Sequence, residues 1–419
     1  MFILLFILLI LLALFGMPLF TVLGSIALAA FHGADINISS VAISMYMLAS
    51  SPLLVAIPLF TFAGYLFANS GTPDRLVRLS RSLFPGGLAV VALMTCAVFT
   101  AFTGASGVTI VAMGGLLFPA LLKDGYNRRF SLGLVTTSGS LGLLFPPSLP
   151  LILYGYVAAV SVDSLFLAGL VPGLLLVVAL SIYGLYQGRR DSVVRNRFSI
   201  TGILSAMRGA AWEVPLPFVV LGGIYSGIIT VMEAAALTAL YALVVEVFIY
   251  RDIPLRRLPE IAAESMTLVG GILIILACAL GLTNYLIDAE VPMQVLEWMQ
   301  QYISSKYTFL LVLNVFLLVV GCLMDIFSAL IVVVPLIVPV AVGFGVDPVH
   351  LGIIFLTNLE IGYITPPVGL NLFISSYRFK EPVLSLYSAS VPFLLILLGA
   401  LLVITYFPAI SLFLLRFAR

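Results

Sequence analysis

Charged residues are scarce in this chain, and their scarcity excludes a soluble protein. Of its 419 residues, 9% are Asp, Glu, Lys or Arg and 62% are hydrophobic, whereas a soluble domain carries about 25% charged residues. Residues 1–34 contain no Lys, Arg, Asp or Glu. The basic region of a cleaved signal peptide is therefore missing, and we expect the first segment to be a retained membrane span.

Cysteine and histidine are also rare, which argues against metal, redox and hydrolytic chemistry. The chain has 3 cysteines and 2 histidines. Cys96, Cys278 and Cys322 stand in apolar segments without a CxxC pair or a Cys/His cluster, so we expect small core residues and no cofactor. The chain also lacks HExxH and GxSxG motifs and any basic tract. These absences indicate neither an enzyme nor a nucleic-acid-binding protein.

Long hydrophobic runs occupy most of the chain. Because ~20 apolar residues make one helical span, the length allows roughly ten to fourteen membrane segments, and we predict an all-α polytopic membrane protein. Basic connections follow several runs, at residues 72–81, 123–129 and 189–197. The connection that contains Asp288 and Glu297 has no Lys or Arg. The positive-inside tendency places the basic connections in the cytoplasm and the acidic one outside.

Two proline pairs interrupt apolar segments at matching places. Pro146-Pro147 and Pro366-Pro367 are separated by a constant offset, 366 − 146 = 220. The same offset relates Gly142 to Gly362 and Pro119 to Pro339. Proline removes a backbone donor, and broken backbone survives in lipid only where protein or an internal cavity satisfies it. We therefore predict two repeats, each with a broken helix; packing kinks in an ordinary bundle would leave the common offset unexplained.

Each broken helix is preceded by two short apolar arms. The arms at about 87–122 meet at the uncharged tip Gly104-Ala-Ser-Gly107, and those at about 308–343 meet near Asp325. Each pair of arms could form either two short spans or a re-entrant hairpin. The small, uncharged tip of the first pair favours the hairpin. The charge pattern makes the two hairpins enter from opposite faces, so the repeats are inverted. Inverted repeats with broken helices are typical of secondary transporters; a channel is the alternative, which closed-off hairpins disfavour.

The motifs around these breaks resemble a known family over nearly the whole chain. They are Ile57-Pro-Leu-Phe-Thr-Phe-Ala-Gly64, Gly104-Ala-Ser-Gly-Val-Thr-Ile-Val-Ala-Met-Gly114, Gly139 to Pro150, Gly223-Ile-Tyr-Ser-Gly227 with Glu233-Ala234, Met324-Asp325 and Thr365-Pro-Pro-Val-Gly-Leu-Asn371. Together they are similar to the large, DctM-like permease subunit of tripartite ATP-independent periplasmic (TRAP) transporters, within the ion-transporter superfamily. Thr230-Val231-Met232 departs from the Thr-Pro-Thr run common in the family, which puts the local turn in doubt.

The resemblance implies a sodium-driven importer of small organic acids, such as C4-dicarboxylates or sugar acids, that works by an elevator motion in the bacterial inner membrane. It implies two partners, a periplasmic substrate-binding protein and a small four-helix DctQ-like membrane subunit, and sodium as the coupling ion. A stand-alone sodium- or proton-coupled carboxylate symporter of the same superfamily is the alternative.

An elevator would divide the chain into a scaffold and a mobile part. The first repeat is expected at 1–187, with scaffold spans at 1–69, a hairpin at about 87–122 and a broken helix at about 130–160. A cytoplasmic linker follows at 188–213. The second repeat is expected at 214–419, with scaffold spans at 214–250, a hairpin at about 308–343 and a broken helix at about 350–376.

The expected site residues lie at the tips and breaks. Glycine lets the backbone approach an ion, and proline frees a carbonyl one turn earlier. By the family pattern, the first sodium site involves Gly104, Ser106, Gly142, Phe145 and Pro146, and the second involves Gly321, Gly362, Thr365 and Val368. Residues expected to contact substrate are Ser106, Asp325, Thr365 and Asn371, beside helix N-termini that suit an anionic group.

The intramembrane carboxylates leave alternatives open. A carboxylate at mid-membrane costs roughly 2.5 to 3.5 kcal/mol, so Asp325 belongs either to a polar site or to a hairpin cap that accepts backbone N–H bonds. Glu360 serves either ion coupling or a bond to a neighbouring helix. Glu233 and Glu246 are expected in packing or in the small-subunit contact. Asp325 aligns with Ala105 at the repeat offset, which excludes a symmetric aspartyl dyad.

Overall fold

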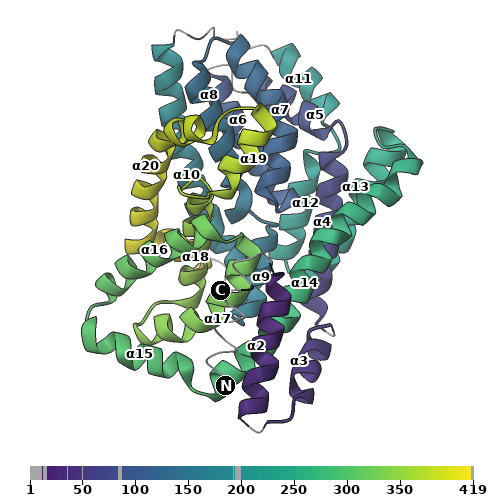
Figure 1. The fold of residues 1–419 in the computed structure, drawn as a ribbon. Coiled ribbons are helices and arrows are strands. Elements are labelled where there is room, and N and C mark those ends of the chain that lie inside the picture. The colour runs from purple at the N-terminus through teal and green to yellow at the C-terminus, as the bar shows by residue number, and fades with distance from the viewer. Residues whose placement is uncertain are drawn as a thin grey trace.

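The computed structural model describes residues 12, 17–34, 36–49, 51–83, 87–191, 193 and 200–416. Within these ranges all regular structure is helical (Figure 1). The apolar run at residues 2–15, which the sequence predicts to be a first arm, lies outside the described residues except for Leu12. Arg195 and Arg197 of the third basic connection lie outside them as well.

The described part of the first half contains four helices, a hairpin, a broken helix and a long helix. Its elements are α2 (Leu19–Gly33), α3 (Ser39–Ala49), α4 (Pro52–Ala68), α5 (Thr72–Leu83), α6 (Leu88–Thr103), α7 (Ser106–Lys123), α8 (Arg128–Ser138), the 3-10 turn η1 (Leu141–Leu144), α9 (Leu149–Val157) and α10 (Val162–Arg190).

The second half repeats this order after a short helix. Its elements are α11 (Ile200–Gly209), α12 (Pro215–Tyr225), α13 (Val231–Leu243), the π-helical turn η2 (Val244–Ile249), η3 (Leu255–Arg257), α14 (Leu258–Asp288), α15 (Val291–Tyr302), α16 (Lys306–Leu323), α17 (Ile326–Gly343), α18 (Pro348–Gly362), α19 (Leu370–Phe379), α20 (Val383–Tyr406), α21 (Pro408–Leu412) and η4 (Leu414–Arg416).

The described helices confirm a polytopic membrane protein with fewer full spans than we expected. Seven are long and apolar enough to cross a membrane, or up to nine if each bent pair counts as one span. Four further apolar helices have only 10–17 residues. Of these four, α6 is a hairpin arm and α18 is half of a broken helix, whereas α2 and α12 are neither.

One predicted span is divided in the structure. The apolar run at about residues 43–69 predicts a single span, but α3 ends at Ala49 and α4 begins at Pro52. Proline has no N–H to donate and is tolerated in the first turn of a helix, where that donor would be unused. The basic connection after α4 is likewise helical, as α5.

The first pair of arms forms a re-entrant hairpin. Helix α6 has 16 residues, which at 1.5 Å per residue is about 24 Å, shorter than the ~30 Å hydrocarbon core. The chain reverses at Gly104, whose φ of +63° is readily available only to glycine. Thr103 and Ser106 on either side of the turn are buried. Because its tip is buried, the hairpin ends inside the protein and not in a loop exposed to water. The small, uncharged tip residues predict this arrangement.

The helix boundaries also match at the repeat offset, so the repeat extends beyond the proline pairs. At the repeat offset, the 18-residue α7 (Ser106–Lys123) corresponds end to end to the 18-residue α17 (Ile326–Gly343). The turns that follow contain Gly125 and Gly345, both with positive φ. The peptide bonds of both Pro-Pro pairs are cis. The two halves therefore share their local structure as well as a few sequence motifs.

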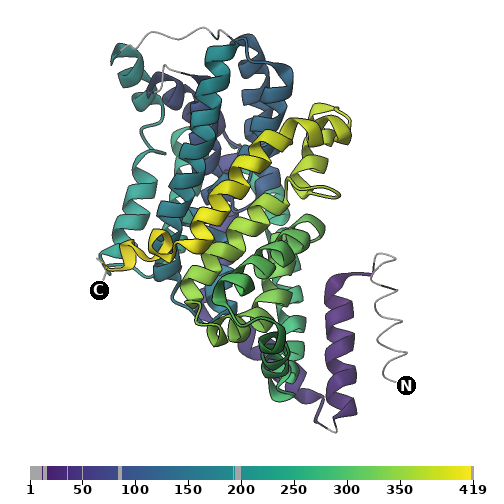
Figure 2. The ribbon, with the colours of Figure 1, turned by 90° about the vertical axis from the view of Figure 1, so that its left-hand side faces the viewer.

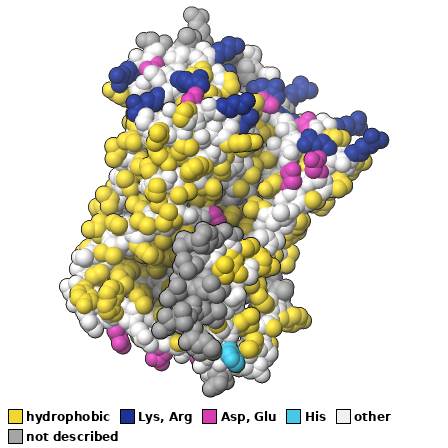
Figure 3. Space-filling model, in the orientation of Figure 1, with side chains coloured by type: hydrophobic (Ala, Val, Ile, Leu, Met, Phe, Trp, Pro, Cys, Tyr) yellow, Lys and Arg dark blue, Asp and Glu magenta, His cyan; other side chains and the backbone are white. Residues whose placement is uncertain are grey.

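Basic side chains gather at one end of the molecule. Figure 3, drawn in the orientation of Figure 1, shows Lys and Arg at the end where α5, α8 and α11 lie, while α2, α3 and α15 lie towards the other end. The positive-inside tendency makes the basic end cytoplasmic. The first hairpin has its base at this end and the second at the opposite end, as inverted repeats require.

Hairpins and broken helices pack across the two halves. Helix α7 contacts α19, and α9 contacts α17, so each hairpin lies against the broken helix of the other repeat. The long α20 contacts α8, α10 and α18 and crosses the molecule diagonally in Figure 2. Beside this assembly, α4 packs on α13 and α14, and α14 packs on α2.

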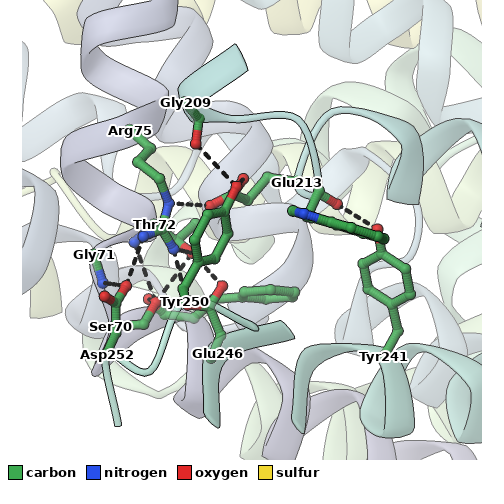
Figure 4. Close-up of polar contacts among 12 residues, drawn as sticks. Ser70, Gly71, Thr72, Arg75, Gly209, Glu213, Tyr241, Glu246, Tyr250 and Asp252 are labelled. Carbon is green, nitrogen blue, oxygen red and sulfur yellow. Dashed lines mark hydrogen bonds and ion pairs between the residues drawn. The ribbon is translucent and has the colours of Figure 1, made fainter. Parts of the chain in front are cut away.

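A buried arginine joins the α4–α5 corner to α13 (Figure 4). Arg75 is 8% exposed. Its guanidinium donates to the carboxylates of Glu213, of Glu246 at 2.8 Å and of Asp252 at 2.6 Å. Glu246 also accepts from the Thr72 hydroxyl at 2.9 Å. The predicted packing role of Glu246 is thus specific: it pairs with Arg75 from the π-helical end of α13.

Tyr250 completes the cluster around Arg75. Its ring lies 3.8 Å from the guanidinium carbon, a cation–π contact. Its hydroxyl is within 3.0 Å of Glu213 Oε2 and 2.9 Å of the Gly209 carbonyl. Burial, and then the neighbouring Glu213, raise the pKa of Tyr250 to about 12. The hydroxyl therefore stays protonated at neutral pH and donates to the cluster.

The Thr230-Val231-Met232 segment, which departs from the Thr-Pro-Thr run of the family that the chain resembles, forms an ordinary helix start. The Thr230 side chain accepts from the Glu233 backbone N–H, and the Glu233 carboxylate accepts from the Thr230 backbone N–H, which makes a capping box. Glu233 therefore serves the local start of α13.

Removing the Arg75 side chain should destabilise the protein strongly. Arg75→Ala leaves three carboxylates without their shared cation, and loss of one partner from a buried ion pair costs about 3–5 kcal/mol. We expect a clear fall in the thermal unfolding temperature of the detergent-purified protein. Arg128→Ala is the control, because Arg128 is 59% exposed in its ion pair with Glu381 and such surface pairs are worth roughly 0–1 kcal/mol. Equal effects of the two substitutions would contradict the anchoring role of Arg75.

Candidate functional site

The first hairpin tip lies against the first broken helix. A Cβ added to Gly104 would stand 2.5 Å from the Leu149 side chain at the start of α9. Thr100 donates to the Gly139 carbonyl at 3.0 Å and shares a hydrogen bond of 2.8 Å with the Thr109 hydroxyl. The tip and the end of α8 are thus joined by a buried threonine pair.

Gly142 allows the first break to contact α6 directly. A Cβ at this position would meet the Ala97 carbonyl and would stand 2.6 Å from the Ala101 amide nitrogen. Phe145 donates its N–H to the Gly142 carbonyl at 3.0 Å, which closes the turn. Phe145 and Pro146 line a cavity of about 220 Å³ together with residues of α6, α10 and α12.

Gly362 repeats this contact in the second half. A Cβ on Gly362 would stand 2.5 Å from the carbonyl carbon of Gly321, at the end of α16. The Gly369 N–H donates to the Cys322 carbonyl at 3.0 Å, and the Thr365 hydroxyl donates to the Ile361 carbonyl at 2.8 Å. The structure therefore brings Gly321, Gly362 and the Thr365 turn together, while Val368 is 38% exposed; a sodium site there remains a prediction.

Asp325 caps the helix that follows the second tip. Its carboxylate accepts from the Ser328 N–H at 3.0 Å and from the Ser328 hydroxyl at 2.7 Å, at the start of α17. The Ile326 N–H donates to the Tyr363 hydroxyl at 2.7 Å, which joins the tip to the second break. These hydrogen bonds are those of a helix cap, which was one of the two roles expected for Asp325. A role of Asp325 towards substrate remains a prediction.

The four residues expected to contact substrate are divided between two regions. Ser106 and Asn371 lie on the contacting helices α7 and α19, whereas Asp325 and Thr365 lie at the second tip and break. Asn371 is buried and donates to the Thr136 carbonyl at 3.3 Å. Its carbonyl oxygen has no protein hydrogen-bond partner in the described part of the chain. That oxygen is an unused acceptor at the point where the repeats meet.

Glu360, near the end of α18, was expected to serve either ion coupling or a bond to a neighbouring helix. Its side chain is fully buried, and both carboxylate oxygens lack hydrogen-bond partners among the described residues. Its backbone carbonyl accepts a hydrogen bond from the Ser140 hydroxyl at 3.4 Å. Ser140 is the repeat counterpart of Glu360, so this bond joins the two breaks. The offset itself could have identified the pair.

The threonine pair at the first tip was also missed. Thr100 and Thr109 lie inside apolar helices, where a hydroxyl often bonds only to its own helix, and their spacing carries no motif. The signal was weak, because contact between them requires the hairpin to close.

The whole chain matches one family. Residues 3–410 match the sequence profile described as "Tripartite ATP-independent periplasmic transporter, DctM component". The chain is 37% identical to the C4-dicarboxylate TRAP transporter large permease protein DctM of Pseudomonas aeruginosa, over 90% of this chain and 89% of that protein. It is 36% identical to the protein of the same description from Rhodobacter capsulatus, over 97% of this chain and 96% of that protein.

A fused relative and a solved structure add to these similarities. The chain is 35% identical to the isethionate TRAP transporter permease protein DctMQ of Oleidesulfovibrio alaskensis, over 95% of this chain and 64% of that longer protein. The crystal structure of the Alcanivorax borkumensis YdaH transporter superposes with a TM-score of 0.66 at 13% identity, over 88% of this chain and 87% of that one. At this identity the likeness concerns the fold alone.

Substitution of Asp325 separates its capping role from any other role. Asp325→Ala should lower the stability of the hairpin by about 0.5–2 kcal/mol through loss of the cap, and Asp325→Ser should restore most of it because serine also caps. Thermal unfolding of the purified variants measures this. Two variants of equal, reduced stability would contradict capping, and a stable but inactive Asp325→Ser protein would assign the carboxylate a further role.

Proposed function

The chain belongs to the DctM family of tripartite ATP-independent periplasmic transporters, and on this premise we propose that it is the membrane subunit of a sodium-driven importer of small organic acids. It is a multi-pass protein of the bacterial inner membrane and a transport protein, not an enzyme. The observation that carries the proposal is the pair of matched contacts in which Gly142 and Gly362, at the two helix breaks, touch the hairpin helices α6 and α16.

Sodium is the coupling ion in this proposal. A hard cation prefers oxygen ligands, and helix breaks supply carbonyl oxygens that no helical N–H uses. The first set comprises Gly104, Ser106, Gly142, Phe145 and Pro146, and the second comprises Gly321, Gly362, Thr365 and Val368. Support comes from the close backbone packing at both breaks, because a bulkier side chain at Gly142 or Gly362 would keep the carbonyls apart.

The substrate class is a small carboxylate or a related anion. Helices α7 and α17 begin at the two tips, and α9 and α19 begin directly after the two breaks. Helix N-termini carry partial positive charge and unused N–H donors, which suit an anionic group. Ser106, Asp325, Thr365 and Asn371 are the proposed contacts. Relatives are described as transporters of C4-dicarboxylates and isethionate, which are anions.

An elevator motion divides the chain into a mobile part and a scaffold. The mobile part comprises the hairpin α6–α7 with α8 and α9, and the hairpin α16–α17 with α18 and α19. Helices α2, α4, α13 and α14 form the scaffold. Contacts of α7 with α19 and of α9 with α17 support one rigid mobile unit, while α4 packs on α13 and on α14 beside it.

Two further proteins complete the transporter. We assign the small DctQ-like subunit and the periplasmic substrate-binding protein as its partners. The fused DctMQ relative supports the small subunit, because this chain covers 64% of that protein and leaves room for a second component.

Uptake by reconstituted vesicles tests the proposal against its alternative. Proteoliposomes that contain this chain, the small subunit and the cognate binding protein should accumulate a labelled carboxylate only when sodium is high outside. Accumulation by the chain alone would support a stand-alone symporter. Sodium-independent flux with single-channel currents would indicate a channel instead.

Substitutions at the first break should reduce sodium-dependent uptake more than folding. Gly142→Leu forces α6 away, and Pro146→Ala provides an N–H that favours a continuous helix. We expect the apparent sodium affinity to fall by roughly tenfold or more, which corresponds to about 1.4 kcal/mol of ion binding. Gly399→Leu is the matched control, because a Cβ on Gly399 meets no atom within 4 Å. Normal sodium dependence in both break variants would count against a cation site there.

A further inference from the structure

Helix α15 lies at the end of the molecule opposite the basic one and connects α14 to the second hairpin (Figure 1). A Cβ on Gly343, at the end of α17, would stand 2.5 Å from the Leu296 side chain, so α15 rests on that hairpin. On its other side Glu297 is exposed, and so are the paired rings of Trp298 and Tyr302. Exposed tryptophan and tyrosine are typical of the membrane–water interface. The helix therefore lies at the level of the outer head groups.

An apolar cavity of about 300 Å³ lies between α15 and the second hairpin. Its walls are α15, α16 and α17, and every described residue that lines it is apolar, for example Met299, Phe309 and Val340. A cavity of about 150 Å³ with such walls stays dry and binds small hydrocarbons. The larger cavity beside α15 thus offers water no hydrogen-bond partner from its side chains and suits a hydrocarbon.

The cavity is open to the lipid-facing side of the protein. Val295, Val312 and Phe316 line it and are 41%, 44% and 46% exposed. Helix α16 has the length and composition of a membrane span, so its exposed side chains meet hydrocarbon and not water. The acyl chains of the surrounding bilayer therefore reach the cavity.

The volume of the cavity decides between a lipid chain and a protein helix. A helix with its side chains is about 10 Å across and one turn is about 5.4 Å long, so one turn occupies roughly 400 Å³. The cavity is smaller than this. An extended hydrocarbon chain is much narrower than a helix, and it is the occupant that fits.

The charges beside the cavity indicate the head group. The connection at 288–305 contains Asp288, Glu290 and Glu297 and has no Lys or Arg. Lys306 follows it and donates to the Gly345 carbonyl. Three carboxylates and one ammonium group leave an excess of negative charge, which repels an anionic head group and attracts an ammonium group. A primary amine also donates charge-assisted hydrogen bonds to carboxylates.

We propose that this cavity binds one acyl chain of an outer-leaflet phospholipid whose head group carries a primary amine, as in phosphatidylethanolamine. The chain enters between Val295 and Val312, and the ammonium group lies by the carboxylates at the start of α15. The site is separate from the proposed ion and substrate contacts. It goes beyond the proposed transport function, because binding there is measured without uptake.

Photo-labelling tests the site in the full chain. Phosphatidylethanolamine with a diazirine in its acyl chain is added in small amount to phosphatidylcholine nanodiscs, and labelled peptides are identified by mass spectrometry. We expect the label on the cavity walls of α15 and α16. Val312→Phe fills part of the cavity and should reduce this labelling by roughly tenfold or more, because the chain loses buried methylene groups. Val315→Phe is the matched control, since Val315 is a 57% exposed valine of the same helix outside the cavity lining.

A second variant and a competition complete the test. Val295→Phe narrows the cavity from the opposite wall and should reduce the labelling similarly, so the result does not depend on the folding of one variant. Excess unlabelled phosphatidylethanolamine should displace the label, and the same excess of phosphatidylglycerol should not.

Equal labelling of the cavity walls in the Val295→Phe, Val312→Phe and Val315→Phe proteins would overturn the proposed site. Equal displacement by the two lipids would overturn the amine head group. Labelling requires no sodium, substrate or partner protein, so a failure here leaves the proposed transport function untouched, and failed uptake by a chain that still binds the lipid would count against transport alone.

Discussion

Backbone polar groups inside a bilayer have no water to bond with, and this constraint governs the centre of the molecule. Two helices are broken there, so their free N–H and C=O groups need protein partners. The structure supplies them by inserting a hairpin beside each break, where Gly142 contacts α6 and Gly362 contacts α16. Hydrogen bonds such as Gly369 to Cys322 and Ile326 to Tyr363 then join break and tip. The breaks and the hairpins therefore depend on each other.

Outside this centre the two halves are not equivalent. The Arg75 cluster joins the α4–α5 corner to α13, whereas the residue at the matching place in α15 is the apolar Val295, which is 41% exposed. The corner between α4 and α5 is thus held by a buried ionic cluster, and α15 has no charged residue at the matching place. This difference accompanies the unequal covering of the two tips, where Thr103 is buried and its repeat counterpart Leu323 is 58% exposed.

Much of the architecture could be predicted because it follows from local chemistry. The Pro-Pro pairs require breaks wherever they stand, and Gly104 with its small neighbours indicates a turn inside the protein. The constant offset then relates the halves. The sequence says less where a distant partner decides the outcome. Glu246 was expected in packing or in the small-subunit contact, and its pairing with Arg75 could not be read from the sequence because it requires α13 and α5 to meet. Ser140 and Glu360 are joined only because the two breaks lie face to face.

The sequence by itself determined the membrane setting, the repeat, the breaks and the family. Apolar composition sets the free energy of transfer into lipid, and proline and glycine set the local backbone geometry. Only the tertiary structure decided which hairpin is covered and which carboxylate is paired. Glu246 pairs with Arg75, whereas the Glu360 carboxylate has no hydrogen-bond partner among the described residues. Those outcomes depend on long-range contacts between segments that are each locally compatible with more than one neighbour. Matching repeats make this plain, because nearly the same local structure at Thr103 and Leu323 is buried in one half and exposed in the other.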